Sequence, residues 1–177
     1  MLALAAVLPA AGCTDPAAPS PTASPTSNAP RVAAPTPTPS AVPGGCGSTA
    51  LGAGAFPDWT ANAGVPGGVW LMSHQGNLVG VIFGYPLVAP PVATGRQNKI
   101  LWIAREPRNG SDLVLTLRPA GGGDAVTVRE SANSGPGEIY PSIVDVPTPG
   151  CWEAVAEWDG HRATFELSYQ PRTGGVS

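Results

Sequence analysis

Charged residues are scarce in this chain of 177 residues: they make up 12% of it, and lysine occurs once, at Lys99. The 9 basic and 12 acidic residues give a formal net charge of −3 at pH 7. A protein that neutralises nucleic-acid phosphates needs clustered lysine and arginine side chains. We therefore expect no nucleic-acid partner.

Motifs for catalysis and for cofactor binding are also missing. The sequence has no Gly-x-Ser-x-Gly elbow, and the glycine run 121–123 lies between two strand candidates, where it indicates a hairpin turn rather than a phosphate loop. Ser73 and His74 are adjacent in an expected strand, so their side chains should point to opposite faces. His74 and His161 belong to no Cys/His cluster with metal-ligand spacing. We expect no enzymatic activity, no cofactor and no metal.

Helical periodicity is absent too, because Pro or Gly interrupts almost every window of ten or more residues. Short apolar or alternating runs predict strands instead. These runs are Val69 to Ser73, Leu78 to Phe83, Lys99 to Arg105, Leu113 to Leu117, Val126 to Arg129 and Ile143 to Val146. Seven or eight short strands at this spacing favour an all-β fold, an antiparallel sandwich or barrel.

The best-specified element is the C-terminal hairpin, Cys151 to Tyr169, with a two-residue turn at Asp159-Gly160. Pairing Trp158 with His161 sets its register. That register also pairs Ala156 with Ala163, Ala154 with Phe165, Trp152 with Leu167, Glu157 with Arg162 and Glu153 with Glu166. We predict that Trp152, Phe165 and Leu167 are buried on one face and that Glu157 and Arg162 are exposed on the other. The Glu153 and Glu166 pair is an unfavourable like-charge contact, by tenths of a kcal/mol.

Proline, alanine, serine and threonine dominate residues 14–43, where no aromatic residue occurs and only Asp15 and Arg31 are charged. Such a segment lacks the apolar area needed to offset chain entropy, so we expect it to be disordered. Its prolines favour polyproline II, and at about 3.1 Å per residue its greatest reach is roughly 90 Å. We interpret it as a tether; an O-glycosylated stalk and a simple disordered tail are the alternatives.

Cys13 follows Leu8-Pro9-Ala10-Ala11-Gly12 at the end of an uncharged apolar run that is too short to span a bilayer. This pattern resembles the lipobox of a bacterial lipoprotein, with Ala10 where lipoboxes usually carry Leu and with no charged residue ahead of Cys13. The resemblance implies cleavage before Cys13 and lipidation of its thiol. An unmodified thiol is the alternative, and a natural start upstream of Met1 stays open.

The number of cysteines fits an exported lipoprotein. Once Cys13 is assigned to the lipid, Cys46 and Cys151 are the only possible intrachain pair, and exported proteins form disulfides. We therefore predict a Cys46–Cys151 bridge. Two free thiols in a cytosolic protein are the alternative, which the apolar run and the tether disfavour.

The segment Gly150-Cys151-Trp152-Glu153, preceded by Pro147-Thr148-Pro149, resembles the C-terminal signature of a group of small exported bacterial proteins of uncharacterised function. The similarity extends to Cys46, to Val69-Trp70-Leu71 and to Lys99-Ile100-Leu101-Trp102. The group implies an immunoglobulin-like β-sandwich without known catalytic residues. Pro149 stands where immunoglobulin domains carry the tyrosine of the tyrosine corner, so the resemblance concerns the architecture.

Surface recognition has two candidate residues, Trp59 in a loop and Tyr85 in the long loop Gly84 to Asn98. We predict ligand contacts there, although Trp59 could instead cover the edge of the sandwich. The other four tryptophans are expected in the core.

Together these patterns predict a signal segment (1–12), a lipidated disordered linker (13–43), a β-sandwich domain (44–170) and a disordered tail (171–177). We expect a monomeric, lipid-anchored protein on the extracytoplasmic face of the cell membrane. It would act as a binding or structural module of the cell envelope, with an envelope protein or polysaccharide as possible partner. The alternative is an accessory carbohydrate-binding domain or an envelope hydrolase.

Overall fold

A computed structural model describes residues 40–91, 98–132 and 138–172 of the chain. Within these ranges eleven strands and one short 3-10 helix follow one another. They are β1 (Ser40–Cys46), β2 (Thr49–Ala53), η1 (Asp58–Ala63), β3 (Val69–Met72), β4 (Leu78–Phe83), β5 (Leu87–Ala89), β6 (Lys99–Ala104), β7 (Leu113–Pro119), β8 (Val126–Glu130), β9 (Ile139–Ile143), β10 (Gly150–Trp158) and β11 (His161–Pro171).

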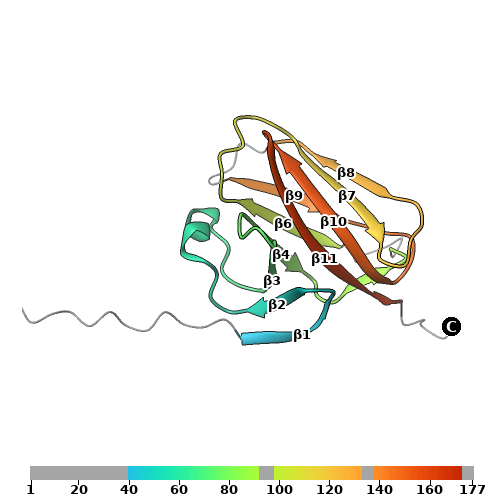
Figure 1. Ribbon diagram of the computed structural model, residues 1–177. Helices are drawn as coiled ribbons and strands as arrows, with labels where there is room; N and C mark the ends of the chain where they lie inside the picture. The colour runs from blue at the N-terminus through green and yellow to red at the C-terminus, as the bar shows by residue number, and fades with distance from the viewer. Residues whose placement is uncertain (1–39, 92–97, 133–137, 173–177) are drawn as a thin grey trace, which may run out of the picture. The chain divides into compact units, whose positions relative to one another are not determined.

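The strands form two sheets that face each other (Figure 1). Sheet A has six strands in the order β1-β2-β3-β4-β6-β9, and sheet B has five in the order β5-β11-β10-β7-β8. All described strand pairs are antiparallel except β5 with β11, which run parallel. The predicted all-β sandwich is therefore confirmed.

The main core fills the space between the sheets, with Trp102 near its middle. The Trp102 ring lies 4.8 Å, centroid to centroid, from the ring of Phe165 on the opposite sheet. Its Nε1 donates a hydrogen bond of 2.9 Å to the Ser142 hydroxyl. Gly80, its cross-strand partner, leaves room for the ring, because a Cβ at Gly80 would lie 2.4 Å from Trp102 Cζ3. One tryptophan thus joins β4, β6 and β9 to sheet B.

Sheet A is apolar on its outer face as well. Its outer cluster consists of Trp70, Val79, Val81, Leu101 and Ile103, and the segment 54–68 covers it with the partly buried Phe56, Trp59, Ala63 and Val65. Strands with both faces buried are expected to be apolar at every position. This double burial explains the uninterrupted apolar runs of β4 and β6, and it places η1 where the sequence indicated no helix.

The C-terminal hairpin has the predicted register at every position, from Trp158 opposite His161 to Trp152 opposite Leu167. Trp152, Phe165 and Leu167 are each about 1% exposed. Glu157 and Arg162 are exposed and form an ion pair of 2.9 Å. Asp159 and Gly160 both have positive φ, as a tight hairpin turn of this kind requires. The predicted burial pattern of the hairpin is confirmed.

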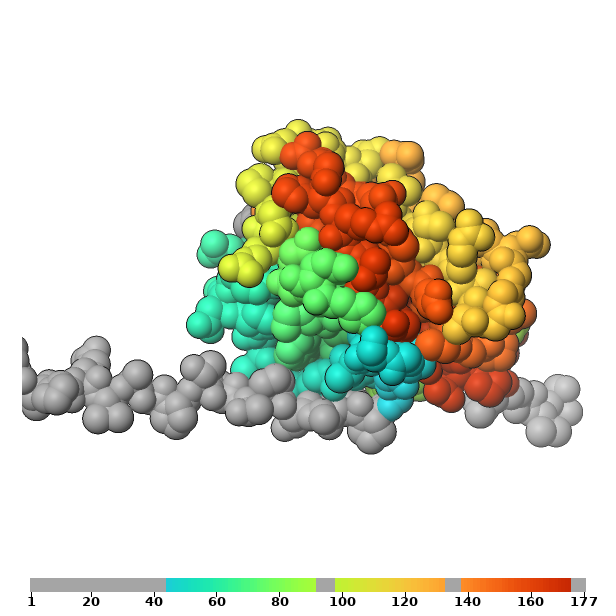
Figure 2. Space-filling model, viewed as in Figure 1, coloured from blue at the N-terminus to red at the C-terminus, as the bar shows by residue number. Residues whose placement is uncertain are grey.

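Turns from sheet A reach across to this hairpin. Figure 2 shows the green residues around the β3–β4 turn and the blue residues of the β1–β2 turn against the red surface of the hairpin. His74 N donates to Thr164 O at 2.9 Å, which joins the β3–β4 turn to β11. The two sheets are therefore linked at one edge by polar contacts as well as by the core.

Several predicted boundaries are corrected. The strand expected at Ile143 to Val146 is β9, which spans Ile139–Ile143. It lies at the edge of sheet A, where a proline such as Pro141 is tolerated. Val144 and Val146 are nevertheless buried, and Tyr169 Oη donates to Val144 O at 2.7 Å. The expected loop Gly84 to Asn98 contains β5, and β1 begins at Ser40 rather than at the expected domain boundary, Gly44. β11 likewise extends to Pro171, within the tail expected at 171–177.

Candidate functional site

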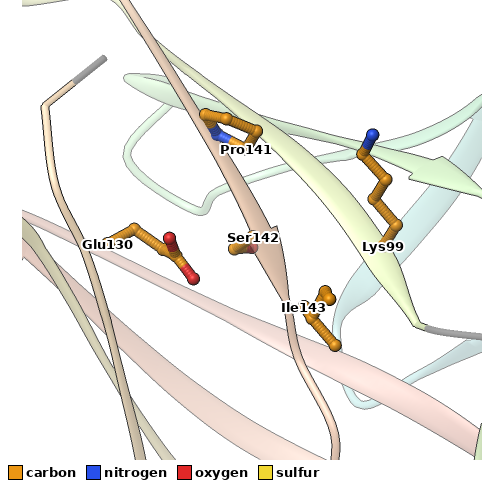
Figure 3. A pocket seen from close by; sticks show the side chains of 5 residues that line it. All are labelled: Lys99, Glu130, Pro141, Ser142 and Ile143. Atoms are coloured by element: carbon orange, nitrogen blue, oxygen red, sulfur yellow. The ribbon is translucent and has the colours of Figure 1, made fainter.

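An open pocket of about 290 Å³ lies between the edge strand β9 of sheet A and the edge strand β8 of sheet B (Figure 3). This edge pocket is lined by Lys99, Glu130, Pro141, Ser142 and Ile143. Ser142 Oγ is already used, since it accepts from Trp102 and donates to Ile100 O. Burial raises the pKa of Glu130. Lys99 and Glu130 are therefore the polar side chains that remain for a ligand or a partner.

A second open pocket, of about 460 Å³, lies at the tip of the C-terminal hairpin. Its charged groups already have partners. Arg162 pairs with Glu157 at 2.9 Å, and Arg129 pairs with Asp112 at 3.3 Å. Asp159 accepts hydrogen bonds from two side chains of the loop before β7. This pocket offers less free polar chemistry than the edge pocket.

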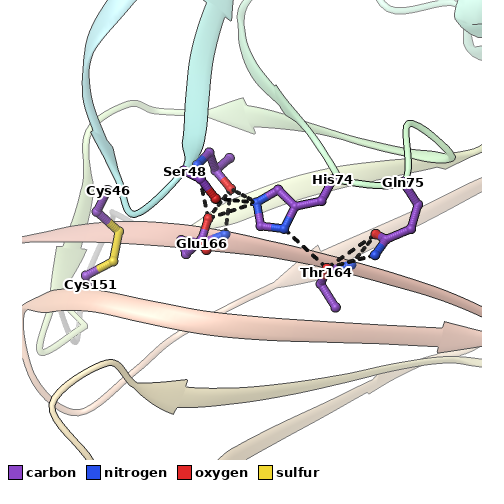
Figure 4. A network of polar contacts seen from close by, with 8 residues as sticks. Cys46, Ser48, His74, Gln75, Cys151, Thr164 and Glu166 are labelled. Atoms are coloured by element: carbon purple, nitrogen blue, oxygen red, sulfur yellow. Dashed lines mark hydrogen bonds and ion pairs between the residues drawn. A yellow bond between two sulfur atoms is a disulfide. The ribbon is translucent and has the colours of Figure 1, made fainter.

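A cluster of polar side chains joins the β1–β2 turn, the β3–β4 turn and β11 (Figure 4). We call Ser48, Thr49, His74, Thr164 and Glu166 the His74 cluster. His74 Nε2 lies 3.1 Å from each of Ser48 Oγ, Thr49 Oγ1 and Glu166 Oε2, and its Nδ1 lies 3.3 Å from Thr164 Oγ1. Glu166 Oε2 also accepts from the backbone N of Thr49 at 3.0 Å and from the Thr49 hydroxyl. Three segments that are distant in sequence thus meet at one carboxylate.

Side chains from the same part of sheet A also satisfy backbone groups of β11. Glu166 N donates to Thr49 Oγ1 at 2.8 Å, and Thr164 N donates to Gln75 Oε1 at 2.7 Å. Asn77 Nδ2 donates to Arg162 O at 3.2 Å. Unpaired groups along a strand edge invite pairing with other chains. These side chains bond to the backbone along the part of the β11 edge that β5 does not cover.

The pKa of Glu166 reflects this setting. Burial alone would raise it, but the Thr49 hydrogen bonds and the His74 imidazole together outweigh burial and lower the pKa of Glu166. The carboxyl side chain is 15% exposed and the imidazole 35%. The ionised carboxylate is therefore the form that stabilises the cluster.

Serine, histidine and glutamate side by side raise the question of a hydrolase triad. In such a triad the carboxylate holds one ring nitrogen while the other nitrogen takes the proton of the serine. Here Ser48 Oγ and Glu166 Oε2 both contact Nε2, and Nδ1 faces Thr164. This arrangement suits a structural junction and does not supply the relay geometry of a triad.

Sequence reasoning missed the His74 cluster, because its members come from distant segments. One signal was present: the like-charge pair of Glu153 and Glu166 on the hairpin. The structure shows that Glu166 turns to Thr49 and His74 for compensation. Ser73, which precedes His74 in the sequence, lies outside the cluster. Its hydroxyl accepts hydrogen bonds from the backbone N–H groups of Asn77 and Leu78.

The predicted bridge between Cys46 and Cys151 is confirmed, with Cα atoms 5.8 Å apart and a sequence separation of 105. It joins the end of β1 to the start of β10, the central strand of sheet B, beside the His74 cluster (Figure 4). The bridge uses two of the three cysteines of the sequence and leaves Cys13. Cys13 and residues 14–39 of the expected tether lie outside the described residues.

The two predicted ligand residues lie against different parts of the molecule. Trp59 is partly buried and contacts the outer cluster of sheet A. Tyr85 is partly buried against the main core between the sheets. The structure does not bring them together, and their ligand contacts stay predictions. The other four tryptophans are each at most 6% exposed, which confirms their expected place in the core.

In residues 40–91, 98–132 and 138–172, no group of three or more His, Cys, Asp or Glu side chains is placed to hold a metal ion. The described part of the chain also contains no helix that is long and apolar enough to cross a membrane.

Comparisons with known proteins add no relative: no family model, no curated protein and no solved structure matches this chain.

Proposed function

We propose that the chain is a lipid-anchored, extracytoplasmic protein whose β-sandwich acts as a binding or structural module of the cell envelope. Cys13 carries the lipid in this proposal, and the segment up to β1 is the tether. The domain presents itself to an envelope partner at the end of that tether.

The observation that carries the proposal is the Cys46–Cys151 disulfide. Disulfides persist in oxidising compartments and are rare in reducing ones, so the bridge supports export. It also uses two of the 3 cysteines and leaves Cys13, at the position of the lipobox resemblance, for modification.

The position of the bridge suits a tethered domain. β1 is one of the two edge strands of sheet A and the first described element after the proposed tether. An edge strand alone is easily peeled away, because it is held from one side. The disulfide fastens its end covalently to the central strand of sheet B, so a load on the tether reaches the core without opening the sheet beyond Cys46.

The alternatives have less support. A serine hydrolase would need a nucleophile and base in the geometry of a triad, which the His74 cluster does not provide. A carbohydrate-binding platform commonly uses exposed aromatic rings. Among the described residues, Phe83 is the one large aromatic side chain in the exposed class, at 41%. A non-catalytic module fits these surfaces better.

Cell fractionation tests the proposal. In a bacterium that processes lipoproteins, the wild-type chain should be found with the membranes, and Cys13→Ser should move it to the soluble or secreted fraction. Ser20→Ala, in the same segment, is the matched control and should leave the distribution unchanged. Equal membrane fractions for wild type and Cys13→Ser would overturn the proposal.

A further inference from the structure

The outer face of sheet A is not covered along its whole length. Phe83, Lys99 and Ile143 are direct cross-strand neighbours on β4, β6 and β9, so their side chains share this outer face. Phe83 and Ile143 are each 41% exposed and are the only large apolar side chains in the exposed class among the described residues. Lys99 lies between them, with Nζ 5.6 Å from the centroid of the Phe83 ring. An exposed apolar row thus flanks the single lysine of the chain.

A carboxylate that makes no ion pair among the described residues lies close to this row. Glu130 lines the same edge pocket as Lys99 and Ile143 and points toward β9 from the other side of the strand (Figure 3). Within the described ranges, neither Lys99 nor Glu130 belongs to any of the ion pairs that the domain forms. The surface therefore presents one free charge of each sign beside two exposed apolar groups.

We propose that this surface joins two copies of the chain about a twofold axis, with Lys99 of each copy against Glu130 of the partner subunit. We call it the dimer surface, defined by Phe83, Lys99, Glu130 and Ile143. A twofold contact uses the same patch on both copies, so each group must meet its complement on that patch. Lys99 and Glu130 meet this condition for charge, and Phe83 and Ile143 meet it for apolar contact.

The contact is made by side chains and not by extension of the sheet. The backbone O of Glu138 and the backbone N of Val144, at the two ends of β9, bond toward β6. In an antiparallel pair the backbone N–H and C=O groups of every second residue between them therefore point away from β6. Pro141 is one of these outward residues and has no N–H to donate. It blocks strand pairing at the centre of the β9 edge, which leaves the exposed side chains as the means of association.

The size of the patch sets the strength of the association. Stable interfaces bury about 1,200–2,000 Å² in total. The dimer surface exposes two apolar side chains, each at 41%, and one charge of each sign, which is less than such an interface uses. The dimer should therefore be weak and form with rising concentration, and dilute protein should remain the monomer that the sequence suggested.

Sedimentation equilibrium of the full chain tests the proposal. The lipid-free Cys13→Ser protein is used, so the result does not depend on the proposed lipid anchor. Its average mass should rise with concentration, and added salt should reduce the rise by screening the charge pairs. Lys99→Glu and Glu130→Lys should each weaken association by about tenfold or more, because each places like charges in contact.

The double variant Lys99→Glu/Glu130→Lys supplies the decisive comparison, since it restores opposite charges with the positions exchanged. It should recover the association of the parent protein. Arg162→Glu, exposed on sheet B, is the control and should have no effect on the mass. A parent protein that stays monomeric at the highest concentration would overturn the proposal, and so would a double variant no better than either single one.

Discussion

Replacing Phe165 by alanine should be among the most damaging single substitutions in this domain. The side chain is 1% exposed, and its ring lies 4.8 Å from that of Trp102 across the two sheets. Trp102 has little freedom to fill the space, because its Nε1 is bonded to Ser142 and its ring lies against Gly80. The cavity should therefore persist, and the loss should be about 3 to 5 kcal/mol, toward the upper end. That is a large part of the 5–15 kcal/mol that stabilises a typical domain.

Urea unfolding of the oxidised protein, followed by tryptophan fluorescence, measures this loss. Arg162→Ala is the matched control on the same strand: its side chain is 59% exposed, and its ion pair with Glu157 lies in solvent. It should cost less than about 1 kcal/mol. The dependence on urea should keep the same slope in both variants if the domain unfolds in one step. Similar losses for the two variants would refute the hairpin register, and so would a loss below about 1 kcal/mol for Phe165→Ala.

Three further predictions concern other parts of the fold. Reduction of the disulfide should lower the free energy of unfolding by about 2 to 4 kcal/mol, measured by urea titration with and without reductant, because the bridge closes a long loop. The lowered pKa of Glu166 means that its carboxylate stabilises the fold above the ordinary carboxyl pKa of about 4.3, and this stability disappears as the pH falls through the lower folded value. Glu166→Gln should flatten this acid limb of the stability curve; an unchanged acid limb would contradict the role of the carboxylate. Gly80→Ala should cost about 1 to 3 kcal/mol, since its Cβ would overlap Trp102, while Gly121→Ala, with no atom within 4 Å, should be neutral. Equal thermal midpoints for the two glycine variants would argue against the close contact.

Local pattern was sufficient to predict the C-terminal hairpin and most inner strands. The hairpin register follows from Asp159-Gly160 and from alternation on both faces, and a shift by one residue would have exposed Phe165. The disulfide followed from counting cysteines once Cys13 was set aside. In both cases a single physical constraint favoured one arrangement over its alternatives.

Other elements depend on distant segments and could not be predicted from local pattern. β5 is three residues long and exists because it pairs with β11. β9 contains Pro141, which strand rules penalise unless the strand is known to lie at an edge. The segment around η1 is placed by the apolar outer face of sheet A, which no local window reveals.

The candidate sites show the same division. The pairing of Cys46 with Cys151 was predicted. The His74 cluster was not predicted, because Thr49, His74 and Glu166 meet only in the folded chain. The edge pocket likewise needs β8 and β9 to lie side by side, which alternation within each strand does not specify.

Mass spectrometry of the N-terminus tests the proposed lipid anchor. The protein is isolated from the membranes of a bacterium that processes lipoproteins, with its disulfide intact. We expect the mature chain to begin at Cys13 and this residue to carry a lipid, while Cys46 and Cys151 remain bridged. A chain that retains the residues before Cys13 and an unmodified thiol would show that Cys13 is no lipid anchor.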